Sequence, residues 1–238
     1  MFEYTASNVS VSFDVPFRAP IFELPRLMSD LSSSLYVQLA DLLTLGPENV
    51  RIVNGSILAD NALVISMFRG NAHMRVQPDN FSVGFTNANP DDYAIIEKAA
   101  TAIAMAVAAH ISTSRWRPGR LRLNGQLEFK ADAKIAGQLL ESFGASAHRI
   151  LLTEPSMLAF YGHRANIVVD DWICDFDLGP RWHQPECLWL SAGVSPYGEP
   201  DQDDSPAARI QGQLDIFRKG MKAFLASVDL YPASRERQ

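Results

Sequence analysis

The stretch RLRLNGQLEF, residues 120–129, alternates apolar and polar side chains from end to end, with a single glycine at an apolar position. Successive side chains of a β-strand point to opposite faces of the sheet, so a period of two is typical of a strand with one buried face. The pattern therefore predicts a half-buried strand over residues 121–129.

A second alternating stretch, VSVSFDV at residues 9–15, begins 112 residues before the strand predicted from residue 121. Similar elements are expected after both stretches: a helix, several short strands and a long helix. In the first half these are a helix between Pro25 and Gly46, strands within 49–87 and a helix over 91–112. In the second half they are a helix containing Ile135, Leu139, Leu140 and Phe143, strands near 165–178 and 187–195, and a last helix starting at Ser205 and Pro206.

This repeated order predicts an α+β protein with an internal structural duplication, in which antiparallel sheets are covered by long helices. Residues 1–118 form the first half and residues 119–238 the second. The two halves could pack as one domain, and their sheets could stay separate or join into one. The final YPASRERQ is expected to be a frayed tail.

The composition is that of an ordinary globular chain, with 47% hydrophobic and 20% charged residues. Its net charge of −6 is shared equally: 8 Lys and Arg stand against 11 Asp and Glu in residues 1–118, and 13 against 16 in residues 119–238. An acidic chain without a basic tail repels phosphate backbones. The charge therefore argues against nucleic acid as the main partner.

Three features of the sequence predict a cytoplasmic protein. The first residues carry no cationic region followed by an apolar run, which a secretory signal would need. The longest nearly uncharged apolar stretch, residues 99–111, is too short to span a bilayer. Two cysteines in 238 residues do not make a disulfide framework, and this favours a reducing compartment.

Several stretches resemble an uncharacterised, sporadically distributed bacterial protein family. They are HMRVQPDNFSVGF, the helix after NPDDY, RLRLNGQLEF, ANIVVDDWICDFDL and LDIFRKGMKAFLASV. Members of that family typically show a Pro-Asp-Gly/Asn-aromatic turn between strands, then a helix, then an Arg-hydrophobic-Asn strand. The resemblance covers about two-thirds of the chain; it implies the fold, but no activity and no catalytic residues.

The segment VSVSFDVPFRAPIF, residues 9–22, resembles the first strand and loop of the SecB export chaperone in its order of Ser-Phe, two prolines and Phe. After this segment we expect a helix, whereas SecB continues into its sheet. We interpret the likeness as a coincidence between strands that are followed by prolines.

The segment VVDDWICDFDLGPRWHQPEC, residues 168–187, gathers five acidic residues, a histidine and both cysteines of the chain. Read as one strand, it places Asp171, Asp175 and Asp177 on the same face, where they could bind Mg²⁺ or Ca²⁺. A solvated face, or an edge protected by charge, is the competing and favoured interpretation.

The same segment offers a thiol site. Cys174, Cys187 and His183 could be zinc ligands, although the Cys-x-x-Cys spacing is absent and a fourth ligand is missing. Cysteines in the core, or at its boundary, are the favoured interpretation.

A cluster of four arginines, Arg115, Arg117, Arg120 and Arg122, surrounds Trp116. Such a cluster can hold phosphate or stack on bases. Alternatively, the arginines simply follow the end of a helix, where the dipole favours cations.

Gly-rich nucleotide loops, the nucleophile-elbow pattern and His-Glu-x-x-His are all absent from the sequence. We therefore expect a non-enzymatic interaction protein that binds a protein or peptide partner through a sheet edge or a helix-covered groove. The most specific version of this hypothesis is chaperone-like binding of extended peptides. We also expect a homo-oligomer with no cofactor and no membrane partner.

Two alternatives remain open at this point. One is a metal-dependent, hydrolase-like enzyme that uses Asp171, Asp175 and Asp177. The other is a binder of anions or nucleic acid through the cluster Arg115–Arg122.

Overall fold

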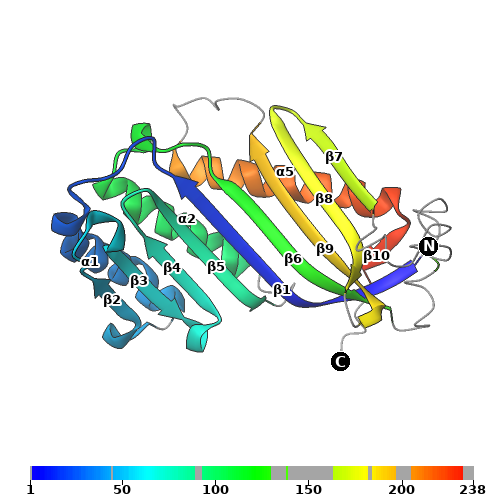
Figure 1. Ribbon diagram of the computed structural model, residues 1–238, viewed down its shortest axis with the longest axis horizontal. Helices are drawn as coiled ribbons and strands as arrows, with labels where there is room; N and C mark the ends of the chain where they lie inside the picture. The colour runs from blue at the N-terminus through cyan, green and yellow to red at the C-terminus, as the bar shows by residue number, and fades with distance from the viewer. Residues whose placement is uncertain are drawn as a thin grey trace.

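Ten strands form one sheet in the computed structural model, which describes residues 2–43, 45–88, 93–129, 138, 163–181, 184–196 and 205–232 (Figure 1). The helices are α1 (Leu24–Leu43), α2 (Tyr93–His110) and α5 (Pro206–Ser227). The strands are β1 (Phe2–Pro16), β2 (Val50–Val53), β3 (Ala62–Met67), β4 (Ala72–Val76), β5 (Asn80–Ala88), β6 (Arg120–Glu128), β7 (His163–Val169), β8 (Trp172–Arg181), β9 (Gln184–Pro196) and β10 (Leu230–Pro232). The expected α+β class is confirmed.

The strand order is β2-β3-β4-β5-β1-β6-β9-β8-β7, and neighbours along this path are antiparallel. The two alternating stretches of the sequence, β1 and β6, lie side by side at the centre, with Phe13 opposite Leu121 and Val11 opposite Leu123. Their pairing joins the two halves of the chain, so both halves contribute to one sheet. β10 adds to the amino-terminal end of β1 in parallel.

Figure 1 shows the three helices on one side of the sheet. α2 lies between the other two and contacts α1, α5 and β5. Its alanines explain this placement, because Ala99 and Ala104 are fully buried and leave room for neighbours on several sides. α1 packs on β2 and β3, while α5 packs on β7, β8, β9 and β10.

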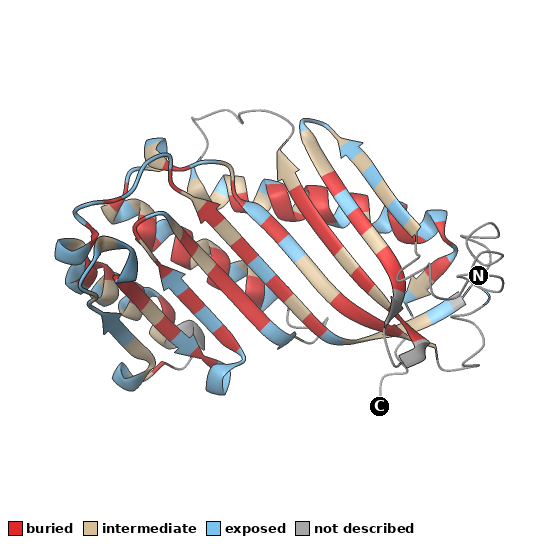
Figure 2. Ribbon diagram, in the orientation of Figure 1, coloured by how far each residue is buried: buried red, intermediate tan, exposed pale blue. Residues whose placement is uncertain are grey.

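The alternation in β1 and β6 determines which side of the sheet is buried (Figure 2). Val11 and Phe13 of β1 and Leu121 of β6 are buried on the helix side. On the other side, Ser12 and Arg122 are exposed. Burial of the apolar positions is the main force that holds such a layer together, at about 25 cal/mol for each Å² removed from water.

The last helix begins where the sequence indicates. The Ser205 side chain accepts a hydrogen bond of 3.2 Å from the backbone N–H of Ala208, and Pro206 occupies the first helical position. Further along, Gln213 donates a 2.7 Å hydrogen bond to the carbonyl oxygen of Gly119, just before β6. The Gln213 contact attaches the amino-terminal half of α5 to the segment that leads into β6.

Two expectations about strands are wrong. The region 165–178 is not one strand but the hairpin β7–β8, with a two-residue turn at Asp170 and Asp171 and with Val169 opposite Trp172. Asp170 has a φ of 52°, a left-handed conformation that Asp tolerates better than most residues. One continuous strand would place Val168 on the same face as Cys174. Because the turn resets the alternation, Val169 instead packs against the core and Val168 is exposed.

The carboxyl-terminal expectation also needs correction. Tyr231 and Pro232 belong to β10, which pairs with Glu3 and Tyr4 of β1, rather than to a frayed tail. The expected helix with Ile135, Leu139, Leu140 and Phe143 lies outside the described residues. Within the described part of the chain, no helix is both long and apolar enough to cross a membrane.

Candidate binding surfaces

The structure separates the three aspartates that were considered as metal ligands. Asp171 is exposed in the β7–β8 turn, whereas Asp175 and Asp177 lie on β8, on the face that is away from the helices. Asp175 sits opposite Gly193 of β9, where the missing side chain leaves space for its carboxylate. Among the residues that the structure describes, no three His, Cys, Asp or Glu side chains are grouped to hold a metal ion.

The two cysteines lie apart from each other. Cys174 is opposite Val194, which is seven residues along β9 from Cys187, so about 23 Å separates the two sites. Burial raises the pKa of the Cys174 thiol to about 11, with a smaller contribution from Asp175, so this thiol is protonated at neutral pH. Cys187 accepts a 3.0 Å hydrogen bond from the side chain of Gln126. His183 lies outside the described residues.

The arginine cluster is divided between two places. Arg115 forms an ion pair with Glu23. The pKa of the Glu23 carboxyl is lowered mainly by a hydrogen bond with its own backbone and, to a smaller extent, by the contact with Arg115. Arg117 is exposed, and its backbone N–H donates to the carbonyl oxygen of Pro16 at 2.7 Å. Trp116 is only 5% exposed and packs against Phe81, so it offers no surface on which a base could stack.

Arg120 and Arg122 lie on the face of the sheet away from the described helices, opposite Asp14 and Ser12 of β1. Burial raises the pKa of Asp14, while a 2.9 Å hydrogen bond from Asn80 and the charges of Arg122 and Arg120 lower it. The two arginines thus face a carboxylate of their own sheet, and this reduces the charge that they present to an external anion.

One serine–histidine contact links two helices. The Ser34 hydroxyl of α1 and the Nε2 atom of His110 of α2 are 2.8 Å apart. A catalytic triad needs a carboxylate on the other ring nitrogen, and no hydrogen bond between His110 and a carboxylate occurs among the described residues. The pair holds α1 and α2 together.

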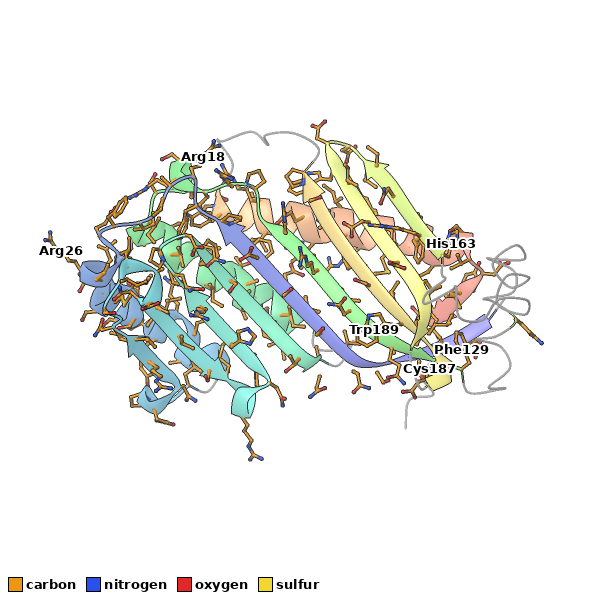
Figure 3. The ribbon with its side chains drawn as sticks, in the orientation of Figure 1. Arg18, Arg26, Phe129, His163, Cys187 and Trp189 are labelled. Atoms are coloured by element: carbon orange, nitrogen blue, oxygen red, sulfur yellow. The ribbon has the colours of Figure 1, made fainter. Side chains whose placement is uncertain are left out.

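Among the strands that the structure describes, β2 is outermost on one side of the sheet and β7 on the other. β2 has only four residues, whereas β7 has seven and pairs with β8 in an unbroken register from His163 to Val169. Three β7 side chains are exposed, and one of them is the apolar Val168 at 64%. The inward side chains pack on the core. His163, labelled in Figure 3, stacks on Phe224 of α5 with 5.8 Å between the ring centroids.

A second surface is an apolar groove beside α5, with a volume of about 540 Å³. One wall is the helical stripe Phe217, Met221 and Leu225, and the floor includes Tyr4 of β1 and Leu123 of β6. β10 closes one end. We name this feature the α5 groove.

Local sequence patterns indicate these two surfaces only in part. The stripe of α5 is visible as helical spacing, but it predicts core packing and not a groove. The groove also needs Tyr4, which is about 200 residues from α5 in the sequence, and β10, whose Tyr231 and Pro232 were expected in a frayed tail. The β7 edge depends on recognising the Asp-Asp turn.

The chain is an α+β protein with one ten-stranded sheet, and the helices that the structure describes all lie on one face of that sheet. No protein-family model matches this sequence, and no curated protein matches it at a significant level.

Proposed function

We propose that this chain is a non-enzymatic interaction protein that binds an extended segment of a protein partner as an additional strand beside β7. The observation that carries the proposal is the seven-residue β7 edge, regular along its length and partly apolar. A strand at the edge of a sheet presents unpaired N–H and C=O groups that another strand can use.

The hairpin geometry identifies those groups. Residues that flank a two-residue turn form a hydrogen-bonded pair, as Val169 and Trp172 do by their register. Hydrogen-bonded pairs then recur at every second residue towards His163. The alternate residues Arg164, Asn166 and Val168 therefore direct their N–H and C=O groups away from β8 and towards an incoming strand.

The devices that usually protect an edge are not found in β7. Proteins block exposed edges with proline, lysine, bulges or very short strands. β7 contains neither proline nor lysine, and its pairing with β8 has no shift of register. Arg164 is the one residue among Asp, Glu, Lys and Arg in β7, and it lies opposite Asp177 of β8.

The expected internal duplication, which is part of this proposal, favours the same edge. If β1 corresponds to β6 and α2 to α5, then β5, β4 and β3 correspond to β9, β8 and β7. β2 is then the strand of the first half that has no described counterpart. In the first half, β2 pairs with β3. No strand within the described ranges takes the corresponding position beside β7, so a partner strand placed there would complete the second half.

The test is binding of a permanently unfolded protein, for example reduced and carboxymethylated α-lactalbumin, followed by fluorescence anisotropy. Asn166→Pro removes one outward N–H and is tolerated at an edge whose N–H faces solvent. Losing this one main-chain hydrogen bond, worth about 0.5–1.5 kcal/mol, should weaken binding by about two- to tenfold. Val168→Lys should act in the same direction, because a lysine blocks an edge.

The matched control is Val37→Lys, which adds the same charge at an exposed valine of α1 (74% exposed) and should leave binding unchanged. Equal binding by the wild-type protein and both β7 variants would refute the proposal. Light scattering on the same samples tests whether a second copy takes this place: a dimer that Asn166→Pro converts to a monomer identifies the partner strand as β7 of another copy.

The proposal places the protein in the cytoplasm, where the free thiols of Cys174 and Cys187 would stay reduced. It assigns no cofactor and no catalytic residue.

A further inference from the structure

The α5 groove differs from the β7 edge in the groups that it offers to a ligand. Its lining is almost wholly apolar, with Phe217, Met221 and Leu225 on the helix and Leu123 on the sheet. A peptide backbone placed there would give up hydrogen bonds with water and find few replacements. An alkyl chain has no such bonds to lose. The groove therefore favours a hydrocarbon over a peptide.

Two cations stand at the rim of the groove, one helical turn apart. Arg218 and Lys222 follow Phe217 and Met221 directly in sequence and belong to the same lining. Arg218 is held in place by Glu97 of α2 at 2.8 Å and by Asp215 at 3.1 Å. Neither ion pair involves Lys222, which is an exposed residue and belongs to the groove lining.

The floor contributes one hydrogen-bond donor. Tyr4 lines the groove from β1, and burial raises the pKa of its phenol. The hydroxyl therefore keeps its proton at neutral pH and can donate it to an acceptor. Together, a hydrocarbon channel, a cationic rim and a phenol donor match a molecule with one anionic end and one long apolar end.

We propose that the α5 groove binds a single fatty acid, with its alkyl chain along Phe217, Met221 and Leu225 and its carboxylate at the rim beside Lys222. This site is separate from the β7 edge, and either proposal can fail without the other. The volume of about 540 Å³ is within the range of small-molecule sites, about 300–1,000 Å³.

The experiment is displacement of the fluorescent fatty acid cis-parinaric acid from the full chain by saturated fatty acids of increasing length. Affinity should rise by about fourfold for each added methylene group, because each is buried. The rise should stop at the length at which the chain fills the groove. Hexadecanol, which lacks the anion, should bind more weakly than hexadecanoate.

Two pairs of variants locate the site. Lys222→Met keeps the apolar stem and removes the charge, and it should weaken hexadecanoate about threefold without changing hexadecanol, as expected for an exposed ion pair. Lys219→Met is its control, an exposed lysine of α5 outside the groove lining. Ala226→Phe places a ring in the groove and should abolish binding of both ligands, whereas the control Ala223→Phe, on exposed α5 surface, should not.

Several results would overturn the proposal. They are no displacement by any fatty acid, an affinity that does not depend on chain length, or equal effects of the groove variants and their controls. Displacement by apolar peptides but not by fatty acids would assign the groove to a protein partner instead. Thermal unfolding by circular dichroism checks that each variant is folded, and Lys222→Met, a surface change, keeps the test available if Ala226→Phe does not fold.

Discussion

Two glycines of α5 offer a direct test of how closely this helix approaches the sheet. A Cβ atom added at Gly220 would lie 2.7 Å from the sulfur of Cys174 and 3.3 Å from the Phe176 ring. A Cβ atom at Gly212, on the same helix, would meet nothing within 4 Å. The two positions therefore differ in packing and share the same helical backbone.

The expected magnitudes follow from this difference. Alanine in place of glycine stabilises a helix interior by about 1 kcal/mol. Gly212→Ala should raise the free energy of unfolding by that amount. At Gly220 the same gain is opposed by overpacking, which costs about 1–3 kcal/mol. Gly220→Ala should therefore be less stable than Gly212→Ala by about 1–3 kcal/mol, because the helical gain cancels in the comparison.

The assay is urea denaturation followed by circular dichroism, supported by thermal unfolding, where about 2–4 °C is expected for each kcal/mol in a domain of this size. Adding Cys174→Ala to Gly220→Ala removes the sulfur and should recover part of the loss, as a double-mutant cycle would show. Equal stability of the two single variants would refute the close contact between α5 and β8.

Three further predictions concern single residues. Ser205→Ala removes the N-cap of α5 and should cost about 1 kcal/mol of unfolding free energy in urea titrations; no change would mean that the cap is not formed in solution. The folded state holds the Cys174 proton more tightly than the unfolded chain, with a pKa of about 11 against 9.0, so its contribution to stability is complete below pH 9 and is lost as the pH rises to 11. Between these pH values the wild-type protein should lose stability more steeply than Cys174→Ala, and parallel curves would contradict the assignment. Asp170→Gly relieves a φ of 52° and should raise the melting temperature, whereas Asp170→Val should lower it; the reverse order would argue against the β7–β8 turn.

Local periodicity accounts for most of what could be predicted. The alternation at residues 9–15 and 121–129 identified the strands that become β1 and β6, and the helical spacing of Ile210, Leu214 and Phe217 identified α5. These patterns reflect which side of a single strand or helix is buried, and residues close together in the sequence are enough to show it. The helix start at Ser205 was equally visible, because capping is a local interaction.

The parts that were missed depend on contacts between distant residues. The pairing of β10 with the first residues of β1 joins positions 230 and 2, and no local pattern marks it. The Asp-Asp turn carries no glycine or asparagine, so the hairpin was read as one strand and the β7 edge was not located. The α5 groove was missed because its lining comes from three segments that are far apart in the sequence: Tyr4, Leu123 and residues within 217–232.

Hydrogen exchange of the β7 amides, measured with and without the carboxymethylated protein, tests the central claim most directly. Strand addition predicts slower exchange at Arg164, Asn166 and Val168 on binding, with little change at Ala165 and Ile167, which already pair with β8. Binding that leaves all five amides unchanged, or that protects β2 instead, would contradict the account.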